Sequence, residues 1–502
     1  MTTGLIVEAL GVLLTLENML FIIIGVIFGM TAGSIPGFTG TNTVAIALPF
    51  TLPMTPEIAL VTLSAIYVGA SYGGAIPAVL INTPGTAGAT ATVLDAYPMS
   101  KKGEASKALG ISIFASAVGG FIAAFIILFL LQPIGDIAFL FTNREIFVLG
   151  LFGLAAVAAA IGDNIRKGLI AGFLGLLIAA MPVDPTTGQR RLDFGYFGLY
   201  DTVPFVPVVV GLFAISELFY LINKRSISEN SVETSYRDIL GGVKYVFVRP
   251  FQLLRAMTIG LLIGSMPGAG TSVANFVSWA AAKSFSSQPE TFGEGNPGGV
   301  IASEGSNSAV TAGSLVPTLA LGIPGSGTTA VMLAALLLHG LRPGPQLLQE
   351  FQVEANVIIL SLFLANIVLL VFALSISKYL VRVVTMPANI IVPGILALTV
   401  IGAYAMRASM FDVWLMFLFG IIGFFMRENG YSLIPLILGV ILGPIIEGAF
   451  LRSMLISGND PMYFFGSTIA IILWIATIGV LVGRPLANVI RGILQSRRSP
   501  GG

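Results

Sequence analysis

The sequence contains no cysteine and a single histidine, His339. Without cysteine the chain can form no disulfide, no thiol nucleophile and no thiolate metal site. Charged residues make up only 10% of the 502 residues, whereas soluble globular proteins carry about 25%. The formal net charge of +1 offers no excess of positive charge for binding nucleic acid. The composition therefore argues against an ordinary soluble protein and against a nucleic-acid-binding protein.

Apolar residues, glycine and proline are abundant instead. Hydrophobic residues account for 56% of the chain and the mean hydropathy is +0.94, which indicates a polytopic protein of the lipid bilayer. The 59 glycines and 27 prolines are too many for straight helical bundles and favour membrane helices that are kinked, closely packed or interrupted. The N-terminus lacks the positive region of a cleavable signal, so Asn18 onward is predicted to be the first retained membrane segment.

Apolar runs that approach the roughly 20 residues needed to cross a bilayer recur along the chain. They fall near 18–34, 105–132, 145–162, 167–182, 203–223, 254–266, 352–377, 386–405, 410–426, 431–447 and 466–483. Two regions between them, 36–100 and 267–341, are poor in charge and rich in Gly, Pro, Thr and Ser. They are predicted to be re-entrant or discontinuous helices, which need protein or a cavity around the backbone. The predicted fold class is an all-α polytopic membrane protein with about 10–12 membrane helices plus hairpins.

One unusual loop occurs twice in the sequence. GSIPGFTGTNTVAIALPF at 33–50 returns as GSMPGAGTSVANF at 264–276, and INTPGTAGATA at 81–91 returns as LGIPGSGTTA at 321–330. Each Pro-Gly pair interrupts a helix, and the Thr, Ser and Asn residues beside it suit a helix cap. The pattern predicts an internal repeat with four helix breaks, arranged two and two.

The two copies are separated by a polar linker at 223–255, which carries six basic residues and an amphipathic stretch at 236–251. With the linker placed inside, most of the 25 lysines and arginines also fall inside, as the positive-inside rule favours. The first copy then runs from an outside Asn18 to an inside Lys101, and the second from an inside Arg255 to an outside Arg342. The repeats are therefore predicted to be inverted, with a periplasmic N-terminus and a cytoplasmic C-terminus.

This topology predicts four parts of the chain. They are a first transmembrane half at 1–222, a cytoplasmic linker at 223–255, a second transmembrane half at 256–484 and a cytoplasmic tail at 485–502. Inverted repeats with discontinuous helices are typical of secondary transporters, in which substrate and coupling ion bind where the breaks converge. The same broken helices would also suit an anion channel or passive pore.

Long segments of the chain resemble the large membrane subunit, the TctA type, of the bacterial tripartite tricarboxylate transporters. The resemblance is carried, in order, by 33–51, 66–110, 267–279, 292–310, 315–347 and 438–460, which include GSIPGFTGTNTVAIALPFT, LVPTLALGIPGSGTTAVMLAALLLHGLRPGPQL and LGVILGPIIEGAFLRSMLISGND. Two departures from the family pattern are Ala96 before Tyr97-Pro98 and the motif SEGSNSAV, with Ser306 and Ser308. The second departure bears on the polar chemistry beside Glu304.

The resemblance implies a bacterial inner-membrane carrier that takes up tricarboxylates or related carboxylates. It implies coupling to a Na⁺ or proton gradient rather than to ATP hydrolysis, and no cofactor beyond a possible Na⁺. It also implies two partners, which are a small membrane subunit of the TctB type and a periplasmic solute-binding protein of the TctC type that delivers the substrate.

The central motifs contain no Arg or Lys, so an anion would be held by backbone N–H groups, helix dipoles, hydroxyls and amides. The predicted substrate-binding residues are Pro36, Gly37, Thr39, Thr41, Asn42, Thr43, Asn82, Thr83, Pro84, Gly85, Thr86, Pro267, Gly268, Gly270, Thr271, Ser272, Pro324, Gly325, Ser326, Gly327 and Thr328. The predicted coupling-ion residues are Asn42, Asn275, Glu304, Asn307 and Thr329. The alternative for any single hydroxyl is that a small residue simply permits close helix packing.

Other polar residues carry two interpretations each. Glu304 is a proton carrier or cation ligand, or else belongs to the polar loop before it. Asp95 is a functional carboxylate, or else caps a loop beside Lys101. His339 is a proton relay, or else a helix-end residue. Three further alternatives concern other positions: Tyr67 and Tyr72 line a cavity or pack, Arg342 is a gate or a surface anchor, and Glu447 with Arg452 forms an ion pair or a scaffold contact.

An enzyme is the least supported class. GEGNPG at 293–298 and GSGTTA at 325–330 fit dinucleotide-binding strings, but neither follows a strand in a βαβ unit. The sequence contains no GxxxxGK[ST] loop and no HExxH helix. With one histidine and no cysteine, an intramembrane enzyme would need Ser-Lys or Asp-pair chemistry, and no convincing pair is present.

Overall fold

The computed structural model describes residues 2–138, 140–160, 164–181, 183, 189–192, 195, 199, 203–222, 235–268, 270–384 and 388–496. Every regular secondary-structure element within these residues is a helix. One isolated β-bridge pairs Val183 with Arg190. The predicted all-α class is therefore confirmed for this part of the chain. The predicted linker and tail include 223–234 and 497–502, which lie outside the described residues.

Eight helices in the described residues are long and apolar enough to cross a membrane. A ninth is reached if α12 (Tyr236–Phe247) and α13 (Pro250–Gly264), which meet at 78°, count as one broken span. The prediction of 10–12 spans is higher because it includes runs that fold as shorter helices. Examples are α13 and α9 (Ile165–Ala179), which have 15 residues each.

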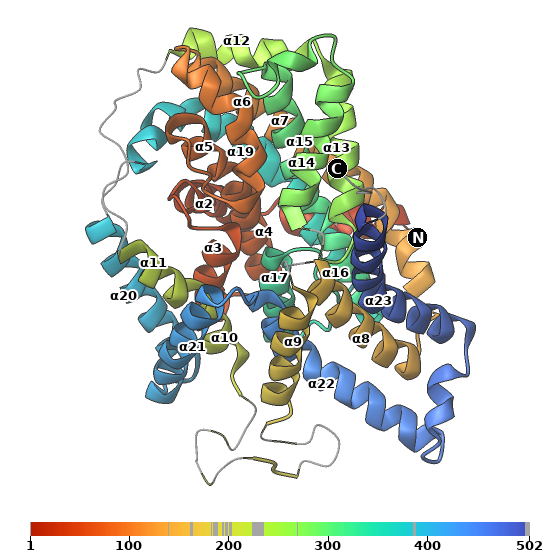
Figure 1. The fold of residues 1–502 in the computed structure, drawn as a ribbon. Coiled ribbons are helices and arrows are strands. Elements are labelled where there is room, and N and C mark those ends of the chain that lie inside the picture. The colour runs from red at the N-terminus through yellow and green to blue at the C-terminus, as the bar shows by residue number, and fades with distance from the viewer. Residues whose placement is uncertain are drawn as a thin grey trace. The chain divides into compact units, whose positions relative to one another are not determined.

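By their internal contacts the residues form two compact units. Unit 1 consists of Met1–Ala138 and Pro204–Phe425, and unit 2 of Phe139–Val203 and Met426–Gly502. All four Pro-Gly motifs belong to unit 1. The residues around these motifs are therefore positioned by the helices of unit 1 (Figure 1).

Unit 1 contains two sets of helices in the same order, and the last two helices of each set match in length. The first set is α2 (Leu16–Gly33), α3 (Gly40–Ala47), α4 (Pro56–Gly73), α5 (Ala75–Ile81) and α6 (Thr90–Lys101); the second is α13, α14 (Gly270–Ser284), α15 (Pro297–Gly313), α16 (Leu315–Leu321) and α17 (Gly327–Leu338). Helices α5 and α16 have seven residues each, and α6 and α17 have 12 each. A long helix follows each set, α7 (Ala105–Ala138) and α19 (Gln352–Val384), the second after the short α18 (Pro345–Glu350).

The chain leaves helical geometry at all four predicted Pro-Gly sites. Helix α2 ends before Ser34, and Gly37 adopts a positive φ of 87° before α3 begins; Gly268, with φ of 73°, takes the same place between α13 and α14. Helices α5 and α16 end in left-handed residues, Asn82 with φ of 58° and Gly322 with φ of 70°. The predicted helix breaks are thus confirmed, and corresponding breaks share their backbone geometry.

Close helix crossings hold the interrupted segments in place. Helix α2 packs against α4, and α13 packs against α15. At the first crossing a Cβ on Gly29 would lie 2.8 Å from the Ala70 nitrogen, and at the second a Cβ on Gly260 would lie 2.8 Å from the Ser306 Cα. Neither site has room for a side chain, because at each crossing the backbones of the two helices lie in close contact. Glycine and other small residues permit such close packing in membrane proteins.

The region 36–100 is less interrupted than predicted. Helices α4 and α5 together form a candidate span at Pro56–Ile81, and 94% of its most apolar window is buried. The helices of this region are discontinuous, as predicted, but the long span formed by α4 and α5 was not predicted, because its glycines, serines and tyrosines lower its hydropathy. A buried membrane helix can keep small and polar residues when neighbouring helices rather than lipid surround it.

The remaining described elements of unit 1 surround these two sets. They are α1 (Thr2–Leu13), η1 (Leu48–Thr51), η2 (Ala87–Ala89), α10 (Phe205–Val210), the π-helical segment η4 (Gly211–Ile215), α11 (Ser216–Ile222), η5 (Pro289–Thr291), α20 (Ala388–Arg407) and most of α21 (Met410–Glu428). Helix α12, which covers most of the predicted amphipathic stretch, buries Ile239, Gly242 and Val246 and packs against α7. It lies along one edge of unit 1 (Figure 1).

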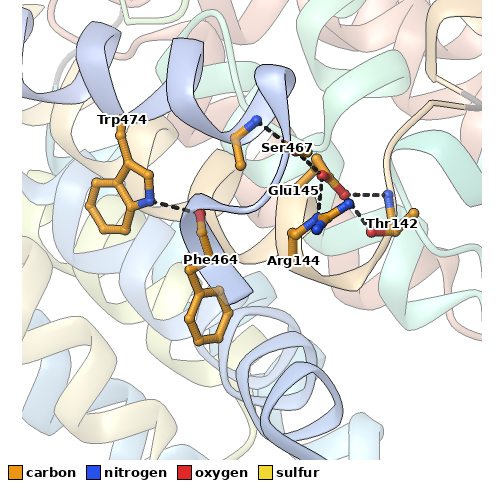
Figure 2. A network of polar contacts seen from close by, with 7 residues as sticks. Thr142, Arg144, Glu145, Phe464, Ser467 and Trp474 are labelled. Carbon is orange, nitrogen blue, oxygen red and sulfur yellow. Dashed lines mark hydrogen bonds and ion pairs between the residues drawn. The ribbon is translucent and has the colours of Figure 1, made fainter. Parts of the chain in front are cut away.

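Unit 2 is built from α8 (Asn143–Ala160), α9, α22 (Leu433–Ile456), η6 (Pro461–Phe465) and α23 (Thr468–Ser496). Figure 2 shows the polar contacts that join the first turns of α8 and α23. Glu145 accepts hydrogen bonds from Arg144 Nε at 2.7 Å and from Ser467 Oγ at 2.5 Å, and Ser467 Oγ in turn accepts from the Ala470 nitrogen. Nearby, Trp474 Nε1 donates to the Phe464 carbonyl at 3.3 Å. The carboxylate therefore caps one helix and anchors the other.

A second carboxylate of unit 2 has a different partner from the predicted one. Glu447 on α22 forms an ion pair with Arg191, with 2.7 Å between Oε1 and Nη1. The predicted pair with Arg452, five residues along the same helix, was wrong, because a partner distant in sequence approaches the carboxylate instead.

Candidate functional site

The first pair of helix breaks meets across the two sets of helices. Thr41 in the first turn of α3 and Thr328 in the first turn of α17 share a hydrogen bond of 3.2 Å between their hydroxyls. The hydroxyl of Tyr67 on α4 lies 3.0 Å from Ser314 Oγ and 3.2 Å from Ser326 Oγ. These residues, with Thr39 and Asn42, are called the first break cluster below. It brings the Pro36 break of one set against the Pro324 break of the other.

Asn42 is the buried amide of the first break cluster. Thr39 is the N-cap of α3, and its hydroxyl accepts from the Asn42 nitrogen and donates to Asn42 Oδ1 at 3.1 Å. The Asn42 side chain is 3% exposed, and its Nδ2 has no hydrogen-bond partner. A buried amide nitrogen with two unpaired N–H groups costs free energy unless something accepts from it. This cluster therefore offers a spare hydrogen-bond donor.

The other two breaks meet in the second break cluster. Ser272 Oγ on α14 donates to the Ala87 carbonyl at 2.9 Å, and Asn275 Nδ2 donates to the Gly88 carbonyl at 2.6 Å. Asn307 Nδ2 on α15 donates to the Ser71 carbonyl at 3.1 Å. Asn275 Oδ1 and the hydroxyl of Thr86 are buried without a partner. The unpaired groups here include the amide oxygen of Asn275, which suits a cation. The unpaired group of the first break cluster is the amide nitrogen of Asn42, which suits an anion.

Several predicted site residues have backbone roles. Asn82 is exposed and is the left-handed residue that ends α5, and the hydroxyl of Thr83 donates to the Ile81 carbonyl at 3.3 Å. Thr329 is buried in a capping box, in which its hydroxyl accepts from the Ser326 nitrogen at 2.9 Å. The predicted coupling-ion residues are divided by their contacts. Asn42 and Thr329 lie at the starts of α3 and α17, whereas Asn275 and Asn307 contact η2 and α4.

Asp95 on α6 secures a loop of the other set of helices. Its Oδ1 accepts from the backbone nitrogens of Gly293, Gly295 and Asn296 at 2.7–3.1 Å, and its Oδ2 accepts from Trp279 Nε1 at 2.7 Å. The interpretation of Asp95 as a loop cap is confirmed, but the loop is GEGN at 293–296 rather than the one beside Lys101. A turn whose N–H groups converge in this way is a nest for a carboxylate.

Changing Asp95 to Asn is expected to release this loop. The neutral amide loses the charge assistance of its hydrogen bonds and presents its NH₂ group to at least one N–H donor, at a cost of about 3 kcal/mol. The measurement is hydrogen exchange of peptides covering 290–297 in purified protein, which should become faster in Asp95→Asn than in the wild type. Unchanged exchange there would contradict the role of Asp95.

Glu304 lies on α15 and is completely buried. Its Oε1 contacts the hydroxyl of Thr92 on α6, and its Oε2 accepts from Ser116 Oγ on α7 at 2.8 Å. It lies inside the helix packing, so it is not part of the polar loop that precedes it. Sequence reasoning missed Thr92, Ser116 and Trp279, because polar residues on separate helices give no local pattern that links them.

Three other side chains with two interpretations, those of His339, Tyr72 and Arg342, also lie among the described residues. His339 ends α17, as the helix-end interpretation expected, and its Nε2 lies 3.1 Å from Thr51 Oγ1. Tyr72 is buried and its hydroxyl has no hydrogen-bond partner. Arg342 is exposed. Of the two tyrosines, Tyr67 therefore belongs to the first break cluster, whereas Tyr72 lies in electrostatic range of Glu304.

Comparisons with known proteins find a family model and similar proteins for this chain. A family model described as "Tripartite tricarboxylate transporter TctA family" matches residues 19–438. The chain is 33% identical over 495 residues to an uncharacterized 52.8 kDa protein in the TAR-I ttuC' 3' region of Agrobacterium vitis, a match that covers 97% of this chain and 95% of that protein. It is also 33% identical over 240 residues to an uncharacterized protein in the TAR-II ttuC' 3' region of the same organism, covering 48% of this chain and 96% of that protein. No solved structure matches the chain.

Proposed function

Because the chain belongs to the tripartite tricarboxylate transporter TctA family, a family of membrane transporters rather than enzymes, we propose that it carries out secondary active uptake of tricarboxylates or related organic carboxylates. Uptake takes place across the bacterial inner membrane and is driven by a Na⁺ or proton gradient. A periplasmic binding protein of the TctC type delivers the substrate, and a small membrane subunit of the TctB type completes the complex.

The unpaired amide nitrogen of Asn42 is the observation that supports the carboxylate site most strongly. It is a buried donor at the N-terminus of α3, and the N-terminus of α17 approaches from the other side through Thr41 and Thr328. Two helix N-termini and an amide N–H group together favour an anion without a basic side chain. A substrate carboxylate in the first break cluster would accept from Asn42 Nδ2 and from the threonine hydroxyls.

If the driving ion is Na⁺, the second break cluster is the site that suits it. Asn275 Oδ1 is a buried oxygen without a donor, and the cluster also contains the Gly88, Ala87 and Ser71 carbonyls, which accept from Asn275, Ser272 and Asn307. Such oxygens are the hard ligands that Na⁺ prefers in transporters with broken helices. A cation bound here would offset part of the negative charge of a tricarboxylate.

The proposal includes the predicted topology. The two matched sets of helices are inverted repeats, the N-terminus is periplasmic and the C-terminus cytoplasmic, with the division into 1–222, 223–255, 256–484 and 485–502. The common order of the two sets, the equal lengths of their last two helices and the reciprocal meeting of their breaks support a repeat. Cysteine accessibility at added positions in 1–17 and 485–502 tests the orientation, and the natural chain provides no background because it contains no cysteine.

Transport by the complete three-subunit complex in proteoliposomes tests the proposed function. The vesicles contain unlabelled citrate, and entry of labelled citrate by counterflow is measured first without any ion gradient. Imposed Na⁺ and pH gradients are then applied separately, and accumulation against the citrate gradient is expected with one of them. Ionic currents far above carrier turnover without citrate exchange would instead identify a channel. A panel of di- and tricarboxylates measured in the same way identifies the substrate.

A further inference from the structure

Glu304 is a buried carboxylate whose charge no basic side chain balances. It is 0% exposed, and no Lys, Arg or His among the described residues forms an ion pair with it. Its two oxygens contact the hydroxyl groups of Thr92 and Ser116, and the neutral side-chain amide of Asn307 is also a hydrogen-bond partner of the carboxyl group. An isolated carboxylate in a membrane protein is costly when ionised, so it is kept where it binds a proton or a cation.

The hydroxyl hydrogens of Ser303 and Thr92 beside Glu304 can be accounted for one by one. Ser303 Oγ has carbonyl acceptors on its own helix, Gly299 at 3.1 Å and Val300 at 3.2 Å. When its single hydrogen points to them, Ser303 Oγ can only accept from Thr92 Oγ1, which lies 3.0 Å away. The hydrogen of Thr92 is then used, so the remaining contact between Thr92 and Glu304 requires a hydrogen on the carboxyl group.

The opposite arrangement serves the ionised state. If Ser303 donates to Thr92, the hydroxyl of Thr92 is free to donate to Glu304, which then needs no proton of its own. Apart from the proton on the carboxyl group, the two arrangements differ only in the rotation of two hydroxyl groups. The chain of hydroxyls can therefore satisfy Glu304 in both protonation states without moving a heavy atom. A site that binds only a metal cation would keep the carboxylate ionised and would need only the second arrangement.

Few other ionisable groups face this carboxylate. The helices that pack against α15 include α4, α6, α7, α13 and α14. Tyr72 on α4 lies in electrostatic range, and its hydroxyl is buried without a hydrogen-bond partner. The other charged side chains described on these helices interact elsewhere: Glu57 with His339, Asp95 in the 293–296 loop, Lys101 over Tyr97, Lys107 with Glu104, Arg255 over Phe285 and Lys283 over Trp279. Protonation of Glu304 therefore changes the charge of a site that contains no balancing cation.

We propose that Glu304 is the proton-binding residue of the transport cycle and that the coupling ion bound there is H⁺. This assignment rests on the proposed transport function and chooses one of its two driving ions. The carboxylate takes up one proton to become a carboxylic acid and gives the same proton back when it is released on the other side. Glu304 belongs to the second set of helices, whereas Thr92 and Ser116 belong to the first set and the long helix after it, so its protonation state acts where the two meet.

Infrared spectroscopy of the purified full-length protein tests proton binding without any substrate. The wild type is expected to show a carboxylic acid C=O band that disappears as the pH is raised, and Glu304→Gln is expected to lack it. Glu354→Gln, which removes a carboxylate in the first turn of α19, is the matched control and should keep the band. Thr92→Val, which interrupts the hydroxyl chain, should keep the band but shift its titration.

Transport by the three-subunit complex provides the second measurement. With the membrane potential held at zero, a gradient of about one pH unit can drive about tenfold accumulation of citrate when one proton accompanies it, since tenfold corresponds to about 1.4 kcal/mol. Glu304→Gln is expected to abolish this accumulation while counterflow of citrate continues, because exchange does not require release of the proton.

The outcomes are distinguishable. A pH-dependent carboxyl band that persists in folded Glu304→Gln would overturn the proposal, and so would unchanged proton-driven accumulation. Loss of a Na⁺ dependence in Glu304→Gln would make the residue a cation ligand instead, which also overturns it. Absence of counterflow in the wild-type complex would refute the transport function, while the infrared result would still decide whether Glu304 binds a proton. The melting temperature of each variant shows whether it is folded.

Discussion

Replacing Gly29 by alanine is expected to abolish the accumulation of folded protein in the membrane. The new Cβ would lie 2.8 Å from the Ala70 nitrogen and closer still to the Ile66 carbonyl oxygen, and both are backbone atoms of α4. Backbone cannot rotate away as a side chain can, so the penalty lies at or above the upper end of overpacking costs, about 3 kcal/mol. The measurement is the yield of monodisperse protein after detergent extraction, together with its melting temperature.

The matched variant for this experiment is Gly394→Ala. Gly394 lies in α20, is exposed, and a Cβ added there would meet nothing within 4 Å. It should leave the yield unchanged or raise it, because alanine favours helix over glycine by about 1 kcal/mol. Gly260→Ala, at the corresponding crossing of α13 and α15, should behave like Gly29→Ala. Equal yields for Gly29→Ala and Gly394→Ala would show that the crossing of α2 and α4 is not as close as described.

Removing the polar groups of the first break cluster is expected to impair transport far more than folding. Asn42→Ala deletes the buried amide that has no partner, and Thr328→Ala deletes one member of the 3.2 Å hydroxyl pair. A hydrogen bond to a charged group contributes about 1.5–3 kcal/mol, so each variant should reduce citrate counterflow by about tenfold or more. Asn42 Nδ2 makes no bond within the protein, and Asn42→Ala removes only the hydrogen bond from Thr39 Oγ1 to Asn42 Oδ1, so the melting temperature should fall by much less than transport does.

Thr258→Ala is the control for these two substitutions. Thr258 is an exposed threonine of α13 whose hydroxyl donates to the Leu254 carbonyl of its own helix. Its removal should leave counterflow at the wild-type level. If the folded double variant Asn42→Ala with Thr328→Ala also transports at that level, the first break cluster is a packing contact and the carboxylate site lies elsewhere.

The helix breaks could be predicted from sequence because their cause is local. Pro36-Gly37 and its three counterparts carry their signal in two adjacent residues, since proline ends a helix and glycine adopts the positive φ that follows. The span at Pro56–Ile81 could not be predicted in the same way. Its residues Gly69, Ser71 and Gly73 read as a polar interruption until the helices that bury them are known.

The partners of the candidate site were harder to predict, because they lie far apart in the chain. Asp95 was expected beside Lys101 but accepts from Gly293, 198 residues away. The sequence around Glu304 contains nothing that predicts its contact with Thr92, which lies 212 residues away in the chain. Polar side chains such as these, spread over different helices, have no periodicity or spacing that a single sequence reveals. What the sequence does reveal is that something must pair with a carboxylate in an apolar segment.

The contact between Thr41 and Thr328 sets the order of events during biosynthesis. The two residues are 287 positions apart in the chain, so at synthesis rates of about 5–20 residues per second the first waits roughly 15–60 s for the second. Through that interval the Thr41 hydroxyl at the start of α3 lacks its partner on α17. The first break cluster is therefore completed only after the second half of the chain has been made.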